Sequence, residues 1–374
     1  MMSANETAAV PADLAPDYVR RINPYVPGKP IEELAREYGL AEEAIVKLAS
    51  NENPRGPSPK AREAIVAACA GITRYPDGNG FALKNALASR YGVDREQIVL
   101  GNGSNDILEL ATQAFLRPGD EAVYSQHGFA VYPLATQARG ATGIQVPARH
   151  YGHDLEAMAR AVTSRTRIVF VANPNNPTGT WLPPAALRAF LAAVPSEVLV
   201  VLDEAYDEYL ETAQRSPSVS WIASHRNLIV SRTFSKAYGL AGLRVGFGVM
   251  DASVADMLNR VRQPFNVSSI AQAAALAALA DTAYVSESAR LNRTGLVQLT
   301  AALDAMRVAY VPSHGNFLLV HVGDGAGVYE RLVRQGVIVR PVANYELPEH
   351  LRVTVGLPEE NRRFLAALES VLGR

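Results

Sequence analysis

The sequence has almost no cysteine, no long apolar run and almost no net charge. Its 374 residues include one cysteine, Cys69, which excludes an intramolecular disulfide framework and a thiolate metal cluster and fits a reducing compartment. Its 36 basic and 37 acidic side chains nearly cancel, so no global field favours nucleic acid or an acidic membrane surface. No apolar stretch approaches the roughly 20 residues that are needed to span a bilayer. We therefore expect no nucleic-acid or membrane partner, and a small anionic ligand would need a local site.

Minor features of the sequence indicate a cytoplasmic protein without a metal site. Residues 1–15 lack the basic start and apolar centre of a signal peptide, so a cytoplasmic location is expected. Cys69 lies in an Ala-rich segment, where we expect a buried small hydrophobic side chain. His150 and His153 lie close together, but no carboxylate or cysteine completes a metal set. We predict no metal, and we expect both histidines to be exposed to solvent.

Helical and strand-like patterns alternate through most of the chain. Short apolar runs occur near residues 98–100, 121–124, 167–172, 198–202 and 227–230. Runs that are buried on both faces and separated by helices predict a mostly parallel sheet in an α/β layer fold. Further along, long helical patterns alternate with short strands near residues 317–320, 337–339 and 351–355. That second pattern predicts a smaller α+β unit.

The change in pattern near residue 268 predicts two domains. Residues 51–268 would form the large domain, and residues 269–374 the small carboxyl-terminal domain. Segment 22–30 carries too many prolines for a helix or a central strand, so we expect an extended arm there. Residues 1–50 would supply this arm and part of the small domain.

The strongest candidate site follows the apolar run 227–230. There the chain breaks into small hydroxylated residues around Lys236, with Arg244 further on. We interpret Lys236 as an amine that forms a Schiff base with an aldehyde cofactor. Thr233, Ser235 and Arg244 would hold the cofactor's phosphate, because a guanidinium makes two parallel hydrogen bonds to phosphate oxygens. Taken alone, the same pattern also fits a solvated loop.

A second candidate site is the glycine-containing turn after residues 98–100. A helical pattern follows, so free backbone N–H groups and the helix dipole would attract an anion above Ser104 and Asn105. The turn lacks the third glycine and the clear downstream acid of a dinucleotide site. A dehydrogenase is therefore disfavoured.

Three polar residues stand where predicted strands end. Asn173, Asp203 and Lys236 each follow a buried apolar run. Ligands of parallel sheets bind beyond the carboxyl ends of the strands, so these side chains are expected to converge. Tyr206 follows Asp203 closely, which favours a site over a carboxylate that only caps a turn.

The ordered motifs at residues 173–179, 203–206 and 235–244 resemble the fold type I pyridoxal-phosphate aminotransferases over nearly the whole chain. The resemblance implies pyridoxal 5'-phosphate as the cofactor. Asp203 would keep the ring nitrogen protonated, and Tyr206 with Asn173 would hydrogen-bond the ring's phenolic oxygen. Lys236 would hold the aldehyde and, once displaced by substrate, act as the general base.

The same resemblance assigns two aromatic residues. Phe129 would stack on the cofactor ring, and Tyr75 would reach the phosphate bound by the neighbouring subunit. A homodimer with shared active sites would then be the catalytic unit. His127 departs from the usual small residue of its stretch and receives no role.

Four short motifs are similar to the histidinol-phosphate aminotransferase subfamily, at residues 24–28, 51–54, 74–77 and 263–267. This similarity implies transfer of the amino group of L-histidinol phosphate to 2-oxoglutarate, with glutamate as product. Arg352 resembles the arginine that binds the substrate carboxylate, and Arg340 is expected to favour the phosphate donor. Tyr25 and Asn53 would close over the imidazole and the phosphate.

Other functions share parts of this pattern. An aminotransferase for aromatic amino acids would carry the same cofactor motifs and differ only in the substrate pocket. A decarboxylase of an amino-acid phosphate would use the same fold. A metabolite-sensing regulator would need a DNA-binding extension, and residues 1–15 are not one.

Overall fold

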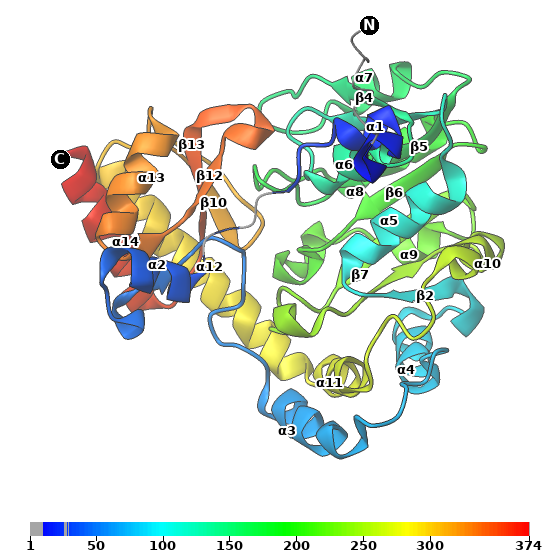
Figure 1. The fold of residues 1–374 in the computed structure, drawn as a ribbon, viewed down its shortest axis with the longest axis horizontal. Helices are drawn as coiled ribbons and strands as arrows, with labels where there is room; N and C mark the ends of the chain where they lie inside the picture. Colours follow the sequence, from blue (N-terminus) through cyan, green and yellow to red (C-terminus); the bar gives the residue numbers. More distant parts are fainter. Residues whose placement is uncertain (1–9, 26–27, 29, 374) are drawn as a thin grey trace, which may run out of the picture.

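The computed structural model describes residues 10–25, 28 and 30–373, which form two sheet-containing parts. The long helix α12 (Thr282–Ala305) runs from the larger part to the smaller one (Figure 1). Residues 26, 27 and 29 of the predicted extended arm lie outside the described residues.

The larger part is built on a seven-stranded sheet with the order β2-β8-β7-β6-β5-β3-β4. Its strands are β2 (Ile98–Gly101), β3 (Glu121–Ser125), β4 (Thr142–Val146), β5 (Thr166–Ala172), β6 (Leu199–Asp203), β7 (Leu228–Thr233) and β8 (Gly246–Val249). Strands β7, β6, β5, β3 and β4 pair in parallel, whereas β8 is antiparallel to both of its neighbours. The predicted mostly parallel α/β sheet is confirmed.

Helices cover both faces of this sheet. They are α3 (Pro59–Ala68), α4 (Phe81–Tyr91), α5 (Ser104–Phe115), α6 (Val131–Gln137), α7 (Leu155–Arg160), α8 (Pro184–Ala193), α9 (Ser218–Trp221), α10 (Ala252–Val261) and α11 (Ser269–Ala280). Successive side chains of β6 enter opposite cores: Leu199 and Val201 one core, Val200 and Leu202 the other. Burial on both faces explains why the central strands are continuous apolar runs.

The smaller part is an antiparallel sheet with the order β12-β13-β10-β9. Its strands are β9 (Tyr310–Val311), β10 (Phe317–His321), β12 (Arg340–Val342) and β13 (Leu347–Thr354), and its helices are α13 (Gly325–Arg334) and α14 (Pro358–Leu372). The amino-terminal segment packs on this part: β1 (Val46–Lys47) pairs with β11 (Val337–Ile338), and Leu34 of α2 (Ile31–Tyr38) is buried against Val333. Residues 31–49 thus join the carboxyl-terminal part, whereas Tyr18 of α1 contacts Gln137 of the larger part. The exact domain boundaries stay a prediction.

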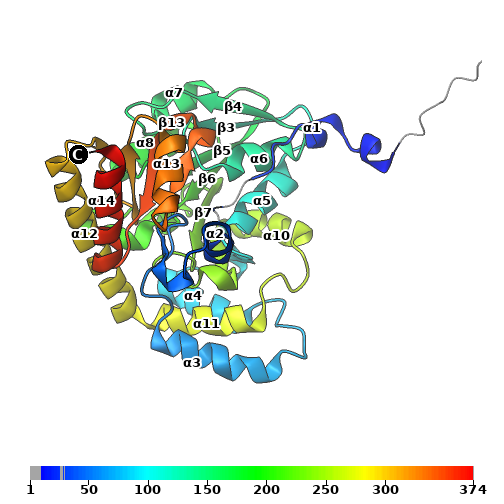
Figure 2. The same cartoon turned by 60° about the vertical axis from the view of Figure 1, so that its left-hand side comes forward.

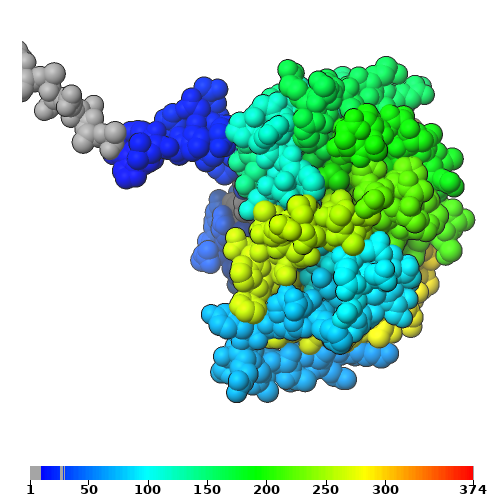
Figure 3. All heavy atoms as spheres, turned by 90° about the vertical axis from the view of Figure 1, so that its right-hand side faces the viewer, coloured from blue at the N-terminus to red at the C-terminus, as the bar shows by residue number. Residues whose placement is uncertain are grey.

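The periphery differs from expectation in one place. Cys69 is exposed, because the short turn Cys69–Gly71 at the end of α3 buries none of its residues. The prediction of a buried thiol is wrong. Helix α1 (Asp17–Arg20) extends from the body of the molecule (Figures 2 and 3). None of the described helices combines the length and apolarity that crossing a bilayer requires.

Candidate active site

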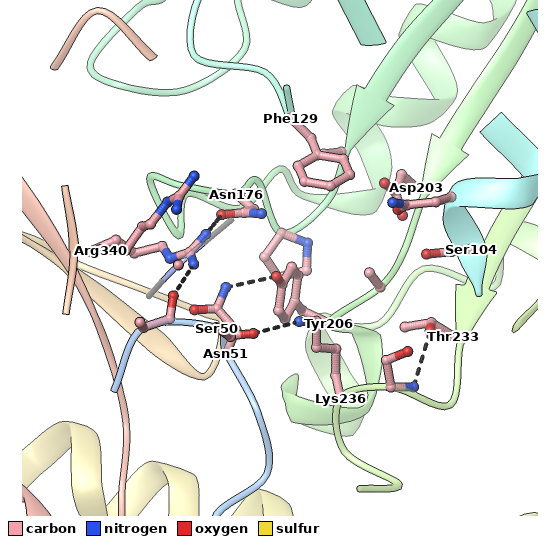
Figure 4. Close-up of a pocket in the computed structure, with 18 of the residues that line it drawn as sticks. Ser50, Asn51, Ser104, Phe129, Asn176, Asp203, Tyr206, Thr233, Lys236 and Arg340 are labelled. Carbon is pink, nitrogen blue, oxygen red and sulfur yellow. Dashed lines mark hydrogen bonds between the residues drawn. The ribbon is translucent and has the colours of Figure 1, made fainter. Parts of the chain in front are cut away.

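A cavity of about 190 Å³ lies at the carboxyl ends of β5, β6 and β7, facing the smaller sheet (Figure 4). Twelve of the residues predicted from the sequence line it: Tyr25, Ser104, Asn105, Phe129, Asp203, Tyr206, Thr233, Ser235, Lys236, Arg244, Arg340 and Arg352. A neighbouring cavity of about 880 Å³ shares Tyr25 and Arg340 with it. Chain topology therefore brings residues from distant segments to one site.

Lys236 follows β7, and its amine points into the cavity. Burial lowers the pKa of its ammonium to about 7, and the nearby cation of Arg352 acts in the same direction. Its Nζ donates to the Ser50 carbonyl at 3.1 Å and lies 5.7 Å from the centre of the Tyr206 ring. A large share of this amine is therefore unprotonated and nucleophilic near neutral pH.

Asp203 ends β6 as a buried carboxylate with one free oxygen. Burial raises its pKa to about 6, although a hydrogen bond from Tyr132 opposes the shift. Tyr132 Oη donates to Oδ2 at 2.9 Å, while the buried Oδ1 has no hydrogen-bond partner among the described residues. Since buried polar atoms are normally paired, this oxygen fits a donor supplied by a ligand, such as a protonated ring nitrogen.

An anion cradle lies where α5 begins. No side chain caps this helix among the described residues, so its first N–H groups remain available beside Ser104. Arg244 Nη1 donates to Ser235 Oγ at 3.2 Å, and Thr233 lines the same side of the cavity. Gly103, with φ of 86°, has no side chain, and a Cβ there would lie 2.4 Å from Arg244 Nη2. The glycine thus admits the guanidinium to the helix terminus.

Arg352 and Arg340 approach the cavity from the smaller sheet. Arg352 is buried; its Nη1 donates to Asn176 Oδ1 and its Nη2 to the Ala49 carbonyl, each at 2.6 Å. Its Nε is buried without a partner among the described residues. Arg340 lies with its guanidinium carbon 5.3 Å from the centre of the Tyr25 ring. Arg340 lies at the opposite side of the cavity from Ser104 (Figure 4). Both cations line the cavity and could meet a second anionic group there.

Asn173 does not lie in the cavity, which corrects its predicted contact with the phenolic oxygen. Its amide is paired with the backbone of Leu182, donating at 3.1 Å and accepting at 2.8 Å. Asn176 lines the cavity instead. Both asparagines precede a proline in one motif, so no local signal distinguishes them, and the prediction named the first.

The predicted substrate-binding role of Asn53 is not supported by its position. Its Nδ2 donates to the Ala237 carbonyl at 2.9 Å and to Ser288 Oγ at 3.1 Å, outside the residues that line the cavity. The prediction is corrected: Asn53 braces the chain next to Lys236. Asn51, which the sequence reasoning passed over, lines the cavity and donates to Tyr206 Oη at 2.9 Å.

Tyr75 lies away from the cavity of its own chain. It is 83% exposed and stacks on Phe265 with 4.8 Å between ring centres. Its predicted contact with a neighbouring subunit stays a prediction.

The histidines divide between surface and core. His150 is exposed, but His153 is buried with Nε2 2.9 Å from the Ala172 carbonyl, so its predicted exposure is wrong. Burial lowers the pKa of His153 to about 4. The described residues contain no group of three or more histidine, cysteine, aspartate or glutamate side chains that could hold a metal ion.

Comparisons with known proteins agree with this geometry. Residues 43–368 match the family model of class I and II aminotransferases. The chain is 60% identical to a histidinol-phosphate aminotransferase of Methylobacillus flagellatus, over 96% of this chain and 98% of that protein. It is 61% identical to histidinol-phosphate aminotransferase 1 of Cupriavidus pinatubonensis, over 96% of each.

Solved structures give the same result. The structure of histidinol-phosphate aminotransferase from Sinorhizobium meliloti in complex with pyridoxal-5'-phosphate matches with a TM-score of 0.88 at 30% identity, over 96% of this chain and 97% of that one. A double mutant of Thermus thermophilus aspartate aminotransferase matches with a TM-score of 0.83 at 25% identity, over 96% of this chain and 99% of that one. The chain therefore belongs to the class I and II aminotransferases and is a transferase of fold type I that uses pyridoxal 5'-phosphate.

Proposed function

We propose that this enzyme transfers the amino group of L-histidinol phosphate to 2-oxoglutarate in histidine biosynthesis, giving imidazole acetol phosphate and L-glutamate. The observation that carries the proposal is the pair of arginines, Arg340 and Arg352, on the wall away from the anion cradle. A phosphate donor and a dicarboxylate acceptor must bind there in turn, and a guanidinium pairs with either anion. Relatives about 60% identical that are named histidinol-phosphate aminotransferases favour this donor over aromatic amino acids.

The residues of the cavity fit pyridoxal phosphate. The unpaired Oδ1 of Asp203 would accept from the ring nitrogen, and the start of α5 with Thr233, Ser235 and Arg244 would hold the phosphate. Ser104 and Asn105, at that helix start, would also contact the phosphate. When bound, the cofactor draws electrons away from the α-carbon of the substrate.

The side faces of the cavity complete the fit. The Phe129 ring lines the cavity, where it would lie against the face of the cofactor ring. It packs edge-on against Tyr132, with 5.9 Å between ring centres. Tyr206 and Asn176, which both line the cavity, would hydrogen-bond the phenolic oxygen.

Lys236 carries the proton transfer. Because burial lowers its pKa to about 7, Nζ is an effective base near neutral pH. It would take the proton from the α-carbon of the amino donor and hold it for return. The same amine, in the resting enzyme, would hold the cofactor covalently. Arg352, Tyr206 and Asn51, which are all buried, line the same cavity as this amine.

An exposed aromatic pair supports the proposal of a homodimer. Tyr75 and Phe265 are 83% and 46% exposed although they stack on each other, and Ile72 beside them is 62% exposed. Exposed apolar groups that cluster in this way are typical of a protein–protein interface. We propose that a second copy covers them and that Tyr75 reaches the phosphate in that copy's site. A cytoplasmic location, expected from the single cysteine, stays a prediction.

Lys236→Ala is expected to lower turnover more than about 1,000-fold, since both the covalent link and the base are lost. Borohydride reduction of the wild type followed by peptide mapping should label Lys236. Lys60→Ala, which removes an exposed lysine on α3, is the matched control and should retain activity. A label on Lys60 or Lys84 would contradict the assignment.

Asp203→Asn is expected to raise the stability of the enzyme without cofactor and to lower the stability of the enzyme with bound pyridoxal phosphate. The folded pKa of Asp203 is raised from 3.8 to about 6, so the folded state binds its proton more tightly and stability falls as pH rises between these values. Removing the carboxylate should therefore raise stability above pH 6 by up to about 3 kcal/mol, and leave it unchanged below about pH 4.

The measurement is thermal melting of both proteins, with and without pyridoxal phosphate, across this pH range. In the loaded enzyme the order should reverse, because an amide cannot hold the ring nitrogen protonated. Asp256→Asn, at an exposed carboxylate of α10, is the control and should show neither effect. Parallel pH curves for Asp203→Asn and the wild type would contradict the role.

Arg352→Ala is expected to impair both half-reactions. Arg340→Ala should lower kcat/KM more for the phosphate donor than for the other donors. Losing one member of a desolvated charge pair costs about 2 to 5 kcal/mol, or roughly 30-fold to several thousand-fold in kcat/KM. Single-turnover reactions with L-histidinol phosphate, glutamate and phenylalanine, followed by the colour of the bound cofactor, measure each donor separately. Equal losses for all three donors in Arg340→Ala would favour the aromatic aminotransferase.

Mixed dimers test the shared site. Tyr75→Ala and Lys236→Ala chains are each expected to be poorly active alone, while hybrids should carry one site that has neither lesion. Activity of the mixture should therefore recover toward half the wild-type level per hybrid. If the mixture shows only the mean of the two parents, Tyr75 serves its own chain. Sedimentation of the wild type supplies the mass of the assembly.

A further inference from the structure

Asn51 is a buried asparagine beside the cavity, and its backbone is left-handed. It is 1% exposed and has a φ of 54°, which asparagine adopts more readily than most residues. Its backbone carbonyl accepts from Asn316 Nδ2 at 3.0 Å, and its backbone N–H donates to Thr354 Oγ1 at 2.9 Å. The side chain therefore starts from a fixed position.

The directions of the hydrogen bonds that link Thr354, Asn51 and Tyr206 follow from the Asn51 backbone N–H, which can only donate. The Asn51 backbone N–H occupies an acceptor position of Thr354 Oγ1, whose own hydrogen then points to Asn51 Oδ1 at 3.2 Å. The Asn51 Nδ2 consequently faces Tyr206 and donates to Oη at 2.9 Å. A flipped amide would place two donors on Thr354 Oγ1 and leave its hydrogen without Oδ1 as acceptor.

The Tyr206 hydroxyl has one hydrogen, which this arrangement turns away from Asn51. Because Oη accepts from Asn51, its hydrogen is directed to another acceptor, and Tyr206 lines the cavity (Figure 4). The hydroxyl also keeps its hydrogen, since burial raises its pKa above the ordinary value for tyrosine.

The charged and titratable groups around Tyr206 come from several elements. Arg352 of β13 lowers the pKa of Tyr206, whereas Asp203 of β6 and the nearby Tyr345 raise it. Lys236 faces the ring itself at 5.7 Å. None of these groups directs the hydroxyl hydrogen by a hydrogen bond among the described contacts, so that task falls to Asn51.

We propose that Asn51 and Thr354 are positioning residues that make Tyr206 a hydrogen-bond donor to the phenolic oxygen of bound pyridoxal phosphate. The proposal rests on the proposed role of Tyr206. A donor held in place stabilises negative charge on that oxygen, which lowers the pH at which the bound cofactor changes colour. Thr354 also belongs to the strand that carries Arg352, and its N–H donates to the Leu48 carbonyl at 2.8 Å. The smaller sheet thus contributes to the orientation of a group in the larger one.

The test compares two changes of Asn51 in two backgrounds. Asn51→Ala removes the donor, and Asn51→Asp keeps the shape but offers only acceptors, so the Tyr206 hydroxyl would turn toward it. The readouts are the pH titration of the visible absorption of the holoenzyme and the equilibrium dissociation constant of cofactor from the apoenzyme. Both variants should raise the transition by about 0.5 to 1 pH unit and weaken cofactor binding about 3- to 10-fold.

Repeating both changes in a Tyr206→Phe background separates orientation from charge and packing. If Asn51 acts through the hydroxyl, its shift should fall to less than half there. A shift of equal size in both backgrounds would overturn the proposal. If Tyr206→Phe alone moves the transition but the Asn51 variants do not, the positioning role fails while the role of Tyr206 stands. If Tyr206→Phe titrates like the wild type, both fall.

A second pair of variants covers the case in which Asn51 is needed for folding. Thr354→Val removes the hydroxyl at nearly constant shape and lets the Asn51 amide flip, so it should move the transition in the same direction. Thr354→Ser restores the hydroxyl and should restore the wild-type titration. Equal titration of the valine and serine variants would contradict the proposed order of hydrogen bonds.

Discussion

The buried carboxylate of Asp203 is the constraint around which the active site is organised. Its place at the end of an apolar strand removes it from water, and burying a charge without a partner is costly. One oxygen is held by Tyr132 and the other is left without a partner among the described residues. Tyr132 in turn stacks on Phe170 with 4.7 Å between ring centres. The core therefore fixes which oxygen of Asp203 faces the ligand. A protonated ring nitrogen bound there would offset the cost of burying the carboxylate charge.

The turn after Asp203 is fixed by the neighbouring strand. Arg232 of β7 donates to Glu204 at 2.5 Å and to Asp207 at 2.8 Å, and all three side chains are buried. These contacts hold the chain on both sides of Tyr206. Burial raises the pKa of Glu204, the Arg232 cation lowers it, and the neighbouring Asp207 carboxylate raises it. Strand β7 thus brings Lys236 to the site and also secures the segment that carries the phenol.

Groups with distinctive chemistry could be found from the sequence because residue type and strand position agree. Asp203, Tyr206 and Lys236 stand at or shortly after the ends of apolar runs, and Arg244 follows Lys236 in the same loop. All four line the cavity. The parallel sheet was predictable for the same reason. Strand β8 was missed, since its Gly246 lies where a Cβ would meet the Ser104 backbone nitrogen at 2.5 Å, and a strand with glycines lacks the usual apolar pattern.

The sequence could not show which of its asparagines line the cavity. An amide side chain serves equally to brace a backbone or to bind a ligand, and nearby asparagines in one motif look alike. Asn173 and Asn176 divided these tasks in one motif, and Asn53 and Asn51 in the other. In both pairs the choice depends on contacts with segments far away in the chain, which no local pattern records.

The segment before Asn51 shows why such contacts matter for catalysis. It lies between the two sheets: Ala49 accepts from Arg352, Ser50 from Lys236, and Asn51 donates to Tyr206. Two of these three contacts use backbone carbonyls, so they are insensitive to side-chain identity and invisible to a motif search. Their effect is nevertheless chemical, because a carbonyl that accepts from an amine or a guanidinium fixes where that group rests before the substrate arrives. The reactive groups of the cavity are therefore held in place by a peptide backbone that has no reactive group of its own.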